Sequence, residues 1–338
     1  MSSSVNSSSE TLIRLLEKSK EFGSEYGNAL ANHLPMALIA LERIGANSRH
    51  ISDFYLHYSP ILEEPDSGKI DINTSTWSLH MGEHRYSLPY RNFFIEEISN
   101  KGVEKALKAY LPTLLKGVSG GAFHPLIRLA YGIEVDSDWE IAESLASWCL
   151  AYNELGPLSQ SQAAPISPLE ALKILSDQTQ EAPIPVSGER VSEWLKSVAT
   201  NQIFVDFYAG LNSKQLTIHD LADTTILLYL STKDSFTALH CVTATHALRV
   251  VSEYYYDQTA VQYLWQSICA SFVVSKCLAI APNHAFGELP DWEKIFEATW
   301  TNRNDHVIKF VYSAHCEFQH YRNPLYQFAA AKKSGLIK

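Results

Sequence analysis

Apolar residues recur at intervals of three and four along most of this chain, which is the spacing of one face of an α-helix. Interruptions by Pro60, Pro65 and Gly68 indicate that residues 51–77 form a loop. Strand–helix alternation and the motifs GxGxxG, GxxxxGK and GxSxG are absent from the sequence. The pattern predicts an all-α fold with helices over residues 10–30, 90–99, 103–115, 137–155, 168–176, 190–199, 220–230, 234–251, 258–281, 291–300 and from Asn304 or Asp305 onward.

The length of 338 residues allows one large domain or two smaller ones, with an ample core. We expect residues 1–10 to form a disordered lead and residues 11–338 to form a single multi-helix domain. Runs rich in Pro, Ser and Gln between residues 156 and 188 are interpreted as a long surface excursion within that domain. A linker between two helical halves is the alternative.

The composition excludes some kinds of binding partner and indicates where in the cell the protein functions. The formal net charge is -10 without a cluster of Lys and Arg, which argues against nucleic acid and anionic membrane surfaces as partners. The N-terminus lacks the apolar segment of a signal peptide, and no apolar run reaches the roughly eighteen residues of a membrane-spanning helix. The 5 cysteines are scattered without a CxxC motif and are interpreted as reduced core thiols. We expect a cytoplasmic protein, and its oligomeric state stays open.

Two histidines, His240 and His246, lie on the largely apolar stretch 234–251. A histidine in an apolar helix is more often a hydrogen-bonded core residue than a ligand, but two of them raise the question of a metal. Their spacing of six residues puts the rings roughly 120° apart on a straight helix. Two ligands from this stretch therefore require a metal between both rings or a local break in the helix.

Two further histidines are expected at helix starts. In the run ANHLPMALIALERIG, Asn32 can cap a helix, Pro35 falls in its first turn and Gly45 follows its end, so His33 lies at the N-terminus. His124 follows a loop containing Gly117, Gly120 and Gly121, which is either flexible or close-packed. Because His124 precedes Pro125, we expect it to be the last non-helical residue before the next helix.

Four sequence blocks in order, NHLPMALIAL, GAFHPLIRLAYGIE, FTALHCVTATHALR and DHVIK, resemble those of the questin oxidase-like family. The resemblance extends from about residue 25 to the final PLYQFAAA. It implies an all-helical fold and oxidative chemistry on polycyclic aromatic polyketides, such as Baeyer–Villiger-type ring opening. It also implies a non-haem iron centre held by four histidines and a carbamylated lysine. At the matching positions of this chain these are His33, His124, His240, His246 and Lys309.

Lys309 lies among Val307, Ile308, Phe310 and Val311. Taken alone, such a lysine is expected to extend to solvent. The resemblance favours burial, because four neutral imidazoles leave a divalent cation uncompensated and a carbamylated lysine supplies an anion. Carbamylation needs the neutral amine, and burial beside a cation lowers the pKa of a lysine.

Carboxylates and a histidine near these blocks can support the ligands by accepting their second N–H. The candidates are Asp223, Asp305, His306 and Glu134, against the alternative that they are ordinary surface residues. The predicted protein is an O2-dependent oxygenase with a buried metal-centred core and a small aromatic substrate. Iron(II) is the expected metal by resemblance, although imidazole also suits copper, zinc and nickel, and NADPH is a possible second cofactor. The rivals are a metal-free, nicotinamide-dependent oxidoreductase and a helical binding protein without catalysis.

Overall fold

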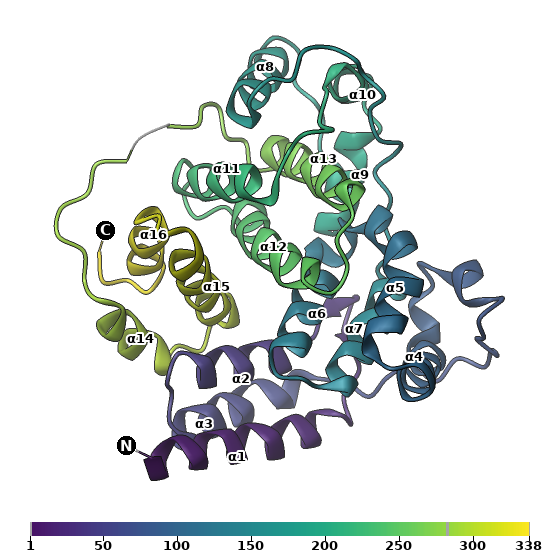
Figure 1. The fold of residues 1–338 in the computed structure, drawn as a ribbon, viewed down its shortest axis with the longest axis vertical. Helices are drawn as coiled ribbons and strands as arrows, with labels where there is room; N and C mark the ends of the chain where they lie inside the picture. The colour runs from purple at the N-terminus through teal and green to yellow at the C-terminus, as the bar shows by residue number, and fades with distance from the viewer. Residues whose placement is uncertain (1, 282–283, 338) are drawn as a thin grey trace. The chain divides into compact units, whose positions relative to one another are not determined.

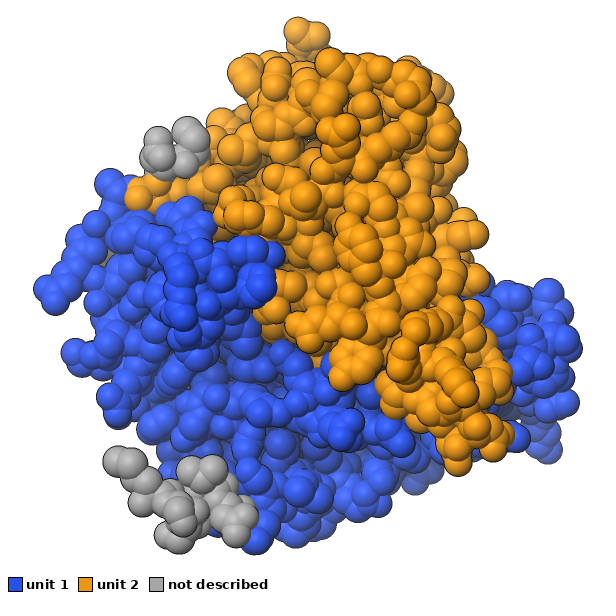
Figure 2. All heavy atoms as spheres, in the orientation of Figure 1, with its two compact units in different colours: residues 1–96, 131–150, 285–338 blue, residues 97–130, 151–284 orange. Residues whose placement is uncertain are grey.

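The architecture is known from a computed structural model, which describes residues 2–281 and 284–337 (Figure 1). These residues form sixteen α-helices, short 3-10 turns and one hairpin of two two-residue strands. The all-α prediction is confirmed. The chain forms two compact units (Figure 2). Unit 1 takes residues up to 96, 131–150 and those from 285, whereas unit 2 takes residues 97–130 and 151–284.

Unit 1 is a set of helices whose centre is formed by α2 and α15. α15 packs against α2, α14 and α16, and α1 packs against α2 and α3. Its elements are α1 (Ser2–Ser19), β1 (Glu25–Tyr26), β2 (Leu30–Ala31), α2 (Leu34–Arg43), α3 (Ser48–Tyr58), most of α4 (Ser87–Lys101), the end of α6 (His124–Glu134), α7 (Asp138–Leu150), α14 (Trp292–Trp300), α15 (Asp305–Tyr321) and α16 (Leu325–Lys333).

The start and end signals of α2 act as expected. Asn32 Oδ1 accepts a hydrogen bond from Leu34 N–H at 2.9 Å, and Pro35 occupies the first turn, where its missing N–H costs nothing. Gly45 follows the helix with a φ of 83°. The N–H groups of Gly45 and Ala46 turn back to the carbonyls of Glu42 and Leu41, which satisfies two end carbonyls. This short, capped helix fixes the position of His33.

The N-terminal end differs from the expected pattern. α1 begins at Ser2 and so overlaps the expected disordered lead 1–10, which stays a prediction, and Met1 lies outside the described residues. Its buried Leu12 and Leu15 anchor the helix, and Ser9 Oγ donates to Glu42. Part of the expected loop 51–77 is helix α3, because Asn47 caps it with its side chain and buried Ile51, Phe54 and Tyr58 give it an apolar face.

Unit 2 is organised around α12, which packs against α11 and α13 (Figure 1). Residues 156–188 lie wholly inside this unit, so the alternative of a linker between helical halves is wrong. Buried Ala171, Leu172 and Leu175 hold α8 in the unit. The elements are the end of α4, α5 (Val103–Leu114), the start of α6, α8 (Pro168–Glu181), α9 (Val191–Ala199), α10 (Gln202–Gly210), α11 (Ile218–Leu230), α12 (Phe236–Ser252) and α13 (Gln258–Val274).

The state of the cysteines and the lengths of the helices agree with what the sequence predicted. All five cysteines are free, and four of them are buried. Among the described residues, every helix is too short or too polar to reach across a lipid bilayer.

Candidate metal centre

The first polar cluster lies in unit 1, where His33 meets Asp305 at the start of α15. Nδ1 of His33 lies against Oδ2 of Asp305 within hydrogen-bonding distance. A carboxylate only accepts hydrogen bonds, so this contact assigns the proton to Nδ1 and leaves the lone pair on Nε2. Asp305 therefore fixes the tautomer and the ring orientation of His33, as a carboxylate does when it accepts the second N–H of a metal-bound histidine.

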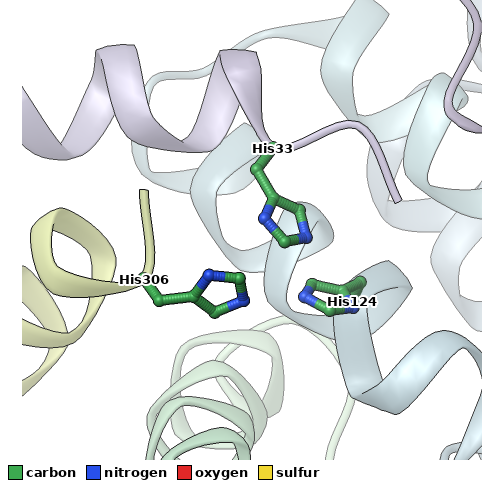
Figure 3. A group of neighbouring side chains, drawn as sticks. All are labelled: His33, His124 and His306. Carbon is green, nitrogen blue, oxygen red and sulfur yellow. The ribbon is translucent and has the colours of Figure 1, made fainter. Parts of the chain in front are cut away.

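His306 contacts both of these residues. Its ring meets the ring of His33 edge to face, with centroids 4.8 Å apart (Figure 3). Its Nδ1 lies 3.1 Å from Asp305 Oδ2, so the same argument leaves its lone pair on Nε2. The sequence assigned His306 only a supporting position. The structure gives it the same relation to Asp305 as His33 has, which sequence alone did not predict.

Lys309 completes this cluster one turn further along α15. Its side chain is 2% exposed, and its Nζ lies 3.7 Å from Asp305 Oδ2. The alternative in which Lys309 extends to solvent is wrong, because α15 packs this face against other helices of unit 1. Burial lowers the pKa of Lys309 to about 8, although the nearby Asp305 raises it. Roughly a tenth of the amine is then neutral at pH 7.

Burial and neighbouring charge also fix the protonation of the other members. Burial lowers the pKa of His33 to about 3, and the charge of Lys309 acts in the same direction. Burial by itself would raise the pKa of Asp305, but His33, His306 and Lys309 lower it below its ordinary value. Near neutral pH the cluster therefore holds a neutral imidazole at His33 and an ionised carboxylate at Asp305.

The second cluster lies in unit 2 and begins with a close-packed glycine loop. A Cβ at Gly117 would meet the Tyr152 ring at 2.5 Å, and one at Gly120 would meet the Ala151 carbonyl oxygen at 2.1 Å. Gly121, Ala122 and Phe123 all have positive φ values. The sequence allowed either a flexible or a close-packed loop here, and the loop is close-packed.

This loop delivers His124 directly into α6. The residue has φ -57° and ψ -37° and is the first residue of the helix, so the expectation that it precedes the helix is wrong. The bias against helical conformation before a proline is a steric preference. Here the left-handed turn and a hydrogen bond from His124 Nδ1 to the Gly121 carbonyl outweigh it.

His124 and His240 face each other through their Nε2 atoms, which are 3.0 Å apart. Both rings are buried. His240 Nδ1 lies 2.7 Å from the Phe236 carbonyl, and His124 Nδ1 contacts the Gly121 carbonyl. Carbonyl oxygens only accept, so both protons sit on Nδ1 and both Nε2 atoms keep lone pairs. Two lone pairs at this distance repel unless a cation or an additional proton lies between them.

His246 is also buried in unit 2, but α12 runs unbroken between the two histidines. Six residues at about 100° each rotate by roughly 600°, which is one full turn and 240°. The side chains of His240 and His246 therefore point away from the helix axis in directions about 120° apart. The local break considered from the sequence does not occur. The structure thus joins His240 to His124, and the role of His246 stays a prediction.

The remaining supporting candidates differ in their surroundings. Asp223 is 51% exposed at its side chain and lies 3.5 Å from the exposed His219 on the same helix, which is the setting of a surface carboxylate. Glu134 is half-buried at the end of α6 in unit 1, and its carbonyl accepts a hydrogen bond from Arg43. Of the four candidates, Asp305 and His306 are the ones that contact His33.

A sequence model of proteins described as questin oxidase-like matches residues 30–314, which is most of the chain. The chain belongs to the questin oxidase-like family. The match contains all four sequence blocks from which the resemblance was drawn, and it includes every residue of both polar clusters.

Two fungal relatives give this membership a chemical context. A Baeyer–Villiger monooxygenase of Cryptosporiopsis sp. (strain 8999) is 29% identical over 133 residues, covering 34% of this chain and 28% of the relative. A Baeyer–Villiger oxidase of Pestalotiopsis microspora is 25% identical over 281 residues, covering 65% of this chain and 59% of the relative. The chain thus spans less than two thirds of the length of either relative.

Proposed function

We propose that this questin oxidase-like protein is an O2-dependent oxygenase of an aromatic or quinone-type, polyketide-like substrate. Its reaction inserts oxygen or cleaves a ring C–C bond, with a Baeyer–Villiger-like outcome. Family membership over residues 30–314 and the two Baeyer–Villiger relatives support this class. A monooxygenase course would also consume a two-electron reductant such as NADPH.

We further propose a divalent metal, with iron(II) in first place, bound by His33, His124, His240, His246 and Lys309. The observation that carries this proposal is the proton placement in both clusters. His33, His124 and His240 each direct Nδ1 to an oxygen acceptor, which leaves Nε2 available as a ligand atom. His306 shares this arrangement and joins the candidates.

The distance between the two imidazoles of unit 2 fits such a metal. Two nitrogen atoms that bind one ion through bonds of about 2.1 Å can lie at most about 4.2 Å apart. The Nε2 atoms of His124 and His240 are 3.0 Å apart, which is within this limit. A metal would thus supply the positive charge that the two facing lone pairs require.

The metal, when bound, would supply the means to activate O2 and to stabilise developing negative charge. The chain's own residues orient and tune the ligands. Asp305 holds the proton of His33 on Nδ1 and fixes the ring. Lys309, with its lowered pKa of about 8, offers an amine that can lose its proton, form an N–C bond to CO2 and release a second proton to leave a carbamate, which would supply an anionic oxygen ligand.

Metal analysis of the purified full-length protein tests this proposal. We expect about one equivalent of iron per chain, and O2 uptake in the presence of a hydroxyanthraquinone and NADPH. His240→Ala should lower metal content and thermal stability together. His219→Ala removes an exposed histidine of the neighbouring α11 and should change neither.

The same measurement separates the rivals. A metal content below about a tenth of an equivalent per chain, with O2 uptake intact, would exclude a metal-dependent oxygenase and favour a nicotinamide-dependent enzyme. Unchanged metal content and stability in His240→Ala, together with no O2 uptake in the wild type, would favour a binding protein.

A further inference from the structure

A surface pocket of about 520 Å³ opens in unit 2 at the N-terminal end of α12. It is formed by Trp194 of α9, residues 231–233 and Ser235 before α12, the first turn of α12, and residues 274–278 at and after the end of α13. Its volume lies within the range of small-molecule sites, which is about 300–1,000 Å³. None of the proposed metal ligands lines this pocket, so we consider separately what it could bind.

The pocket carries positive charge in an acidic protein. Lys233 and Lys276 both line it, and both are exposed. Across residues 2–281 and 284–337, neither lysine has a carboxylate within ion-pairing distance. The nearby Asp234 accepts a hydrogen bond from Tyr229 and is not part of the lining. Two unpaired lysines in one pocket of a chain with net charge -10 favour an anionic ligand.

An aromatic side chain lies between this pocket and the histidine pair. Phe236 lines the pocket and is 43% exposed, so part of its ring is accessible to a ligand. Its ring packs against the imidazole of His240, with centroids 4.2 Å apart. Its carbonyl also accepts the hydrogen bond from His240 Nδ1. An aromatic ligand packed on Phe236 would therefore lie one side chain away from the His124–His240 pair.

We propose that the α12 pocket, defined by the lining described above, binds the substrate through an aromatic ring on Phe236 and an acidic group at Lys233 and Lys276. The substrate class is thus an aromatic acid or phenolate, and not a neutral polycycle. This proposal rests on the proposed oxygenase function and adds the charge of the substrate to it. The Trp194 side chain is held in place by a hydrogen bond from its Nε1 to the Gly188 carbonyl, so part of the wall is preformed.

A matched pair of ligands tests the charge preference. Anthraquinone-2-carboxylate and anthraquinone-2-carboxamide have the same rings and differ in the charge of one substituent. In calorimetric titrations of the full-length protein, we expect the carboxylate to bind about tenfold more tightly, the order for two solvent-screened ion pairs. Raising the ionic strength should reduce this preference.

Lys233→Gln/Lys276→Gln should abolish the preference and leave binding of the carboxamide unchanged. Lys69→Gln/Lys214→Gln removes the same charge from two exposed lysines outside the pocket and should keep the preference. Equal affinity of the two ligands for the wild type, a preference that survives in Lys233→Gln/Lys276→Gln, or loss of carboxamide binding in that variant would overturn the proposal.

Metal content and O2 uptake, measured on the same preparations, separate this proposal from the oxygenase function. A metal-containing protein that consumes O2 but shows no charge preference would refute the pocket alone. A protein that shows the preference but neither contains metal nor consumes O2 would refute the oxygenase function and leave an aromatic-anion binding site.

Discussion

One half-buried carboxylate, Asp305, organises the polar cluster around His33 in unit 1. It contacts Nδ1 of both His33 and His306, and it lies 3.7 Å from the amine of Lys309. From the sequence, Asp305 and Asp223 were equivalent candidates for this role. Their surroundings in the structure distinguish them, because Asp223 lies beside an exposed histidine.

The difference between these two carboxylates is testable. Asp305→Asn keeps the shape of the side chain but removes the charge that holds the proton of His33 on Nδ1. We expect the affinity for the metal to fall by about 10- to 100-fold, which is typical for loss of a residue that supports a ligand. Titration of the metal-free protein measures this change. Asp223→Asn serves as the control, and an equal loss in both variants would contradict the assignment.

The lowered pKa of Lys309 makes a prediction about stability and pH in the metal-free protein. Between pH 8 and 10.5 the unfolded chain keeps a proton on this amine that the folded chain has released, so the wild type gains stability as the pH rises. At pH 7 the buried ammonium is charged, and Lys309→Met should be more stable than the wild type by about 3 kcal/mol.

This advantage of Lys309→Met should shrink between pH 8 and 10.5 and be absent above that range. Urea denaturation of both proteins at pH 7, 9 and 10.5 measures the difference in free energy of unfolding. A variant that is less stable than the wild type at pH 7 would show that the ion pair with Asp305 outweighs the cost of burying the amine.

At the scale of elements, the loop before α6 positions His124 by close packing. Gly117 and Gly120 lie against Tyr152 and Ala151, leaving no room for side chains. The following left-handed residues then turn the chain into the helix at His124. The glycines in the sequence indicated a special loop, but its geometry depends on the neighbouring residues 151–152.

Substitution of one of these glycines tests the packing. In Gly120→Ala the new Cβ would meet the Ala151 carbonyl oxygen, so the loop must shift. We expect a loss of about 2 kcal/mol in the free energy of unfolding and a lower metal content. Gly210→Ala is the matched control, because a Cβ there meets nothing within 4 Å. Equal stability of the two variants in urea denaturation would refute this account of the loop.

At the scale of the whole molecule, the proposed ligands are spread from residue 33 to residue 309. A metal that binds the folded chain and not the unfolded one stabilises it by mass action, by about 4 kcal/mol at a thousandfold excess over Kd. Removal with a chelator should therefore lower Tm by roughly 5–10 °C, and added iron(II) should restore it. A Tm that is independent of metal concentration would contradict a folded-state metal site.

The sequence by itself determined the helical class and those helices whose start and end signals are local. Asn32, Pro35 and Gly45 specify α2, and Asn304 caps α15, because caps act through hydrogen bonds and backbone conformations of neighbouring residues. α3 was missed although Asn47 caps it in the same way, since the prolines that follow it dominated the pattern.

Only the tertiary structure decided which polar residues are buried and which contact one another. An isolated Lys309 fits a solvent-exposed helix as well as a buried one, and the packing of α15 decides between them. Likewise, the pairing of His124 with His240 joins residues 116 positions apart. The choice depends on which helix faces meet across a core, and local sequence patterns do not encode that contact.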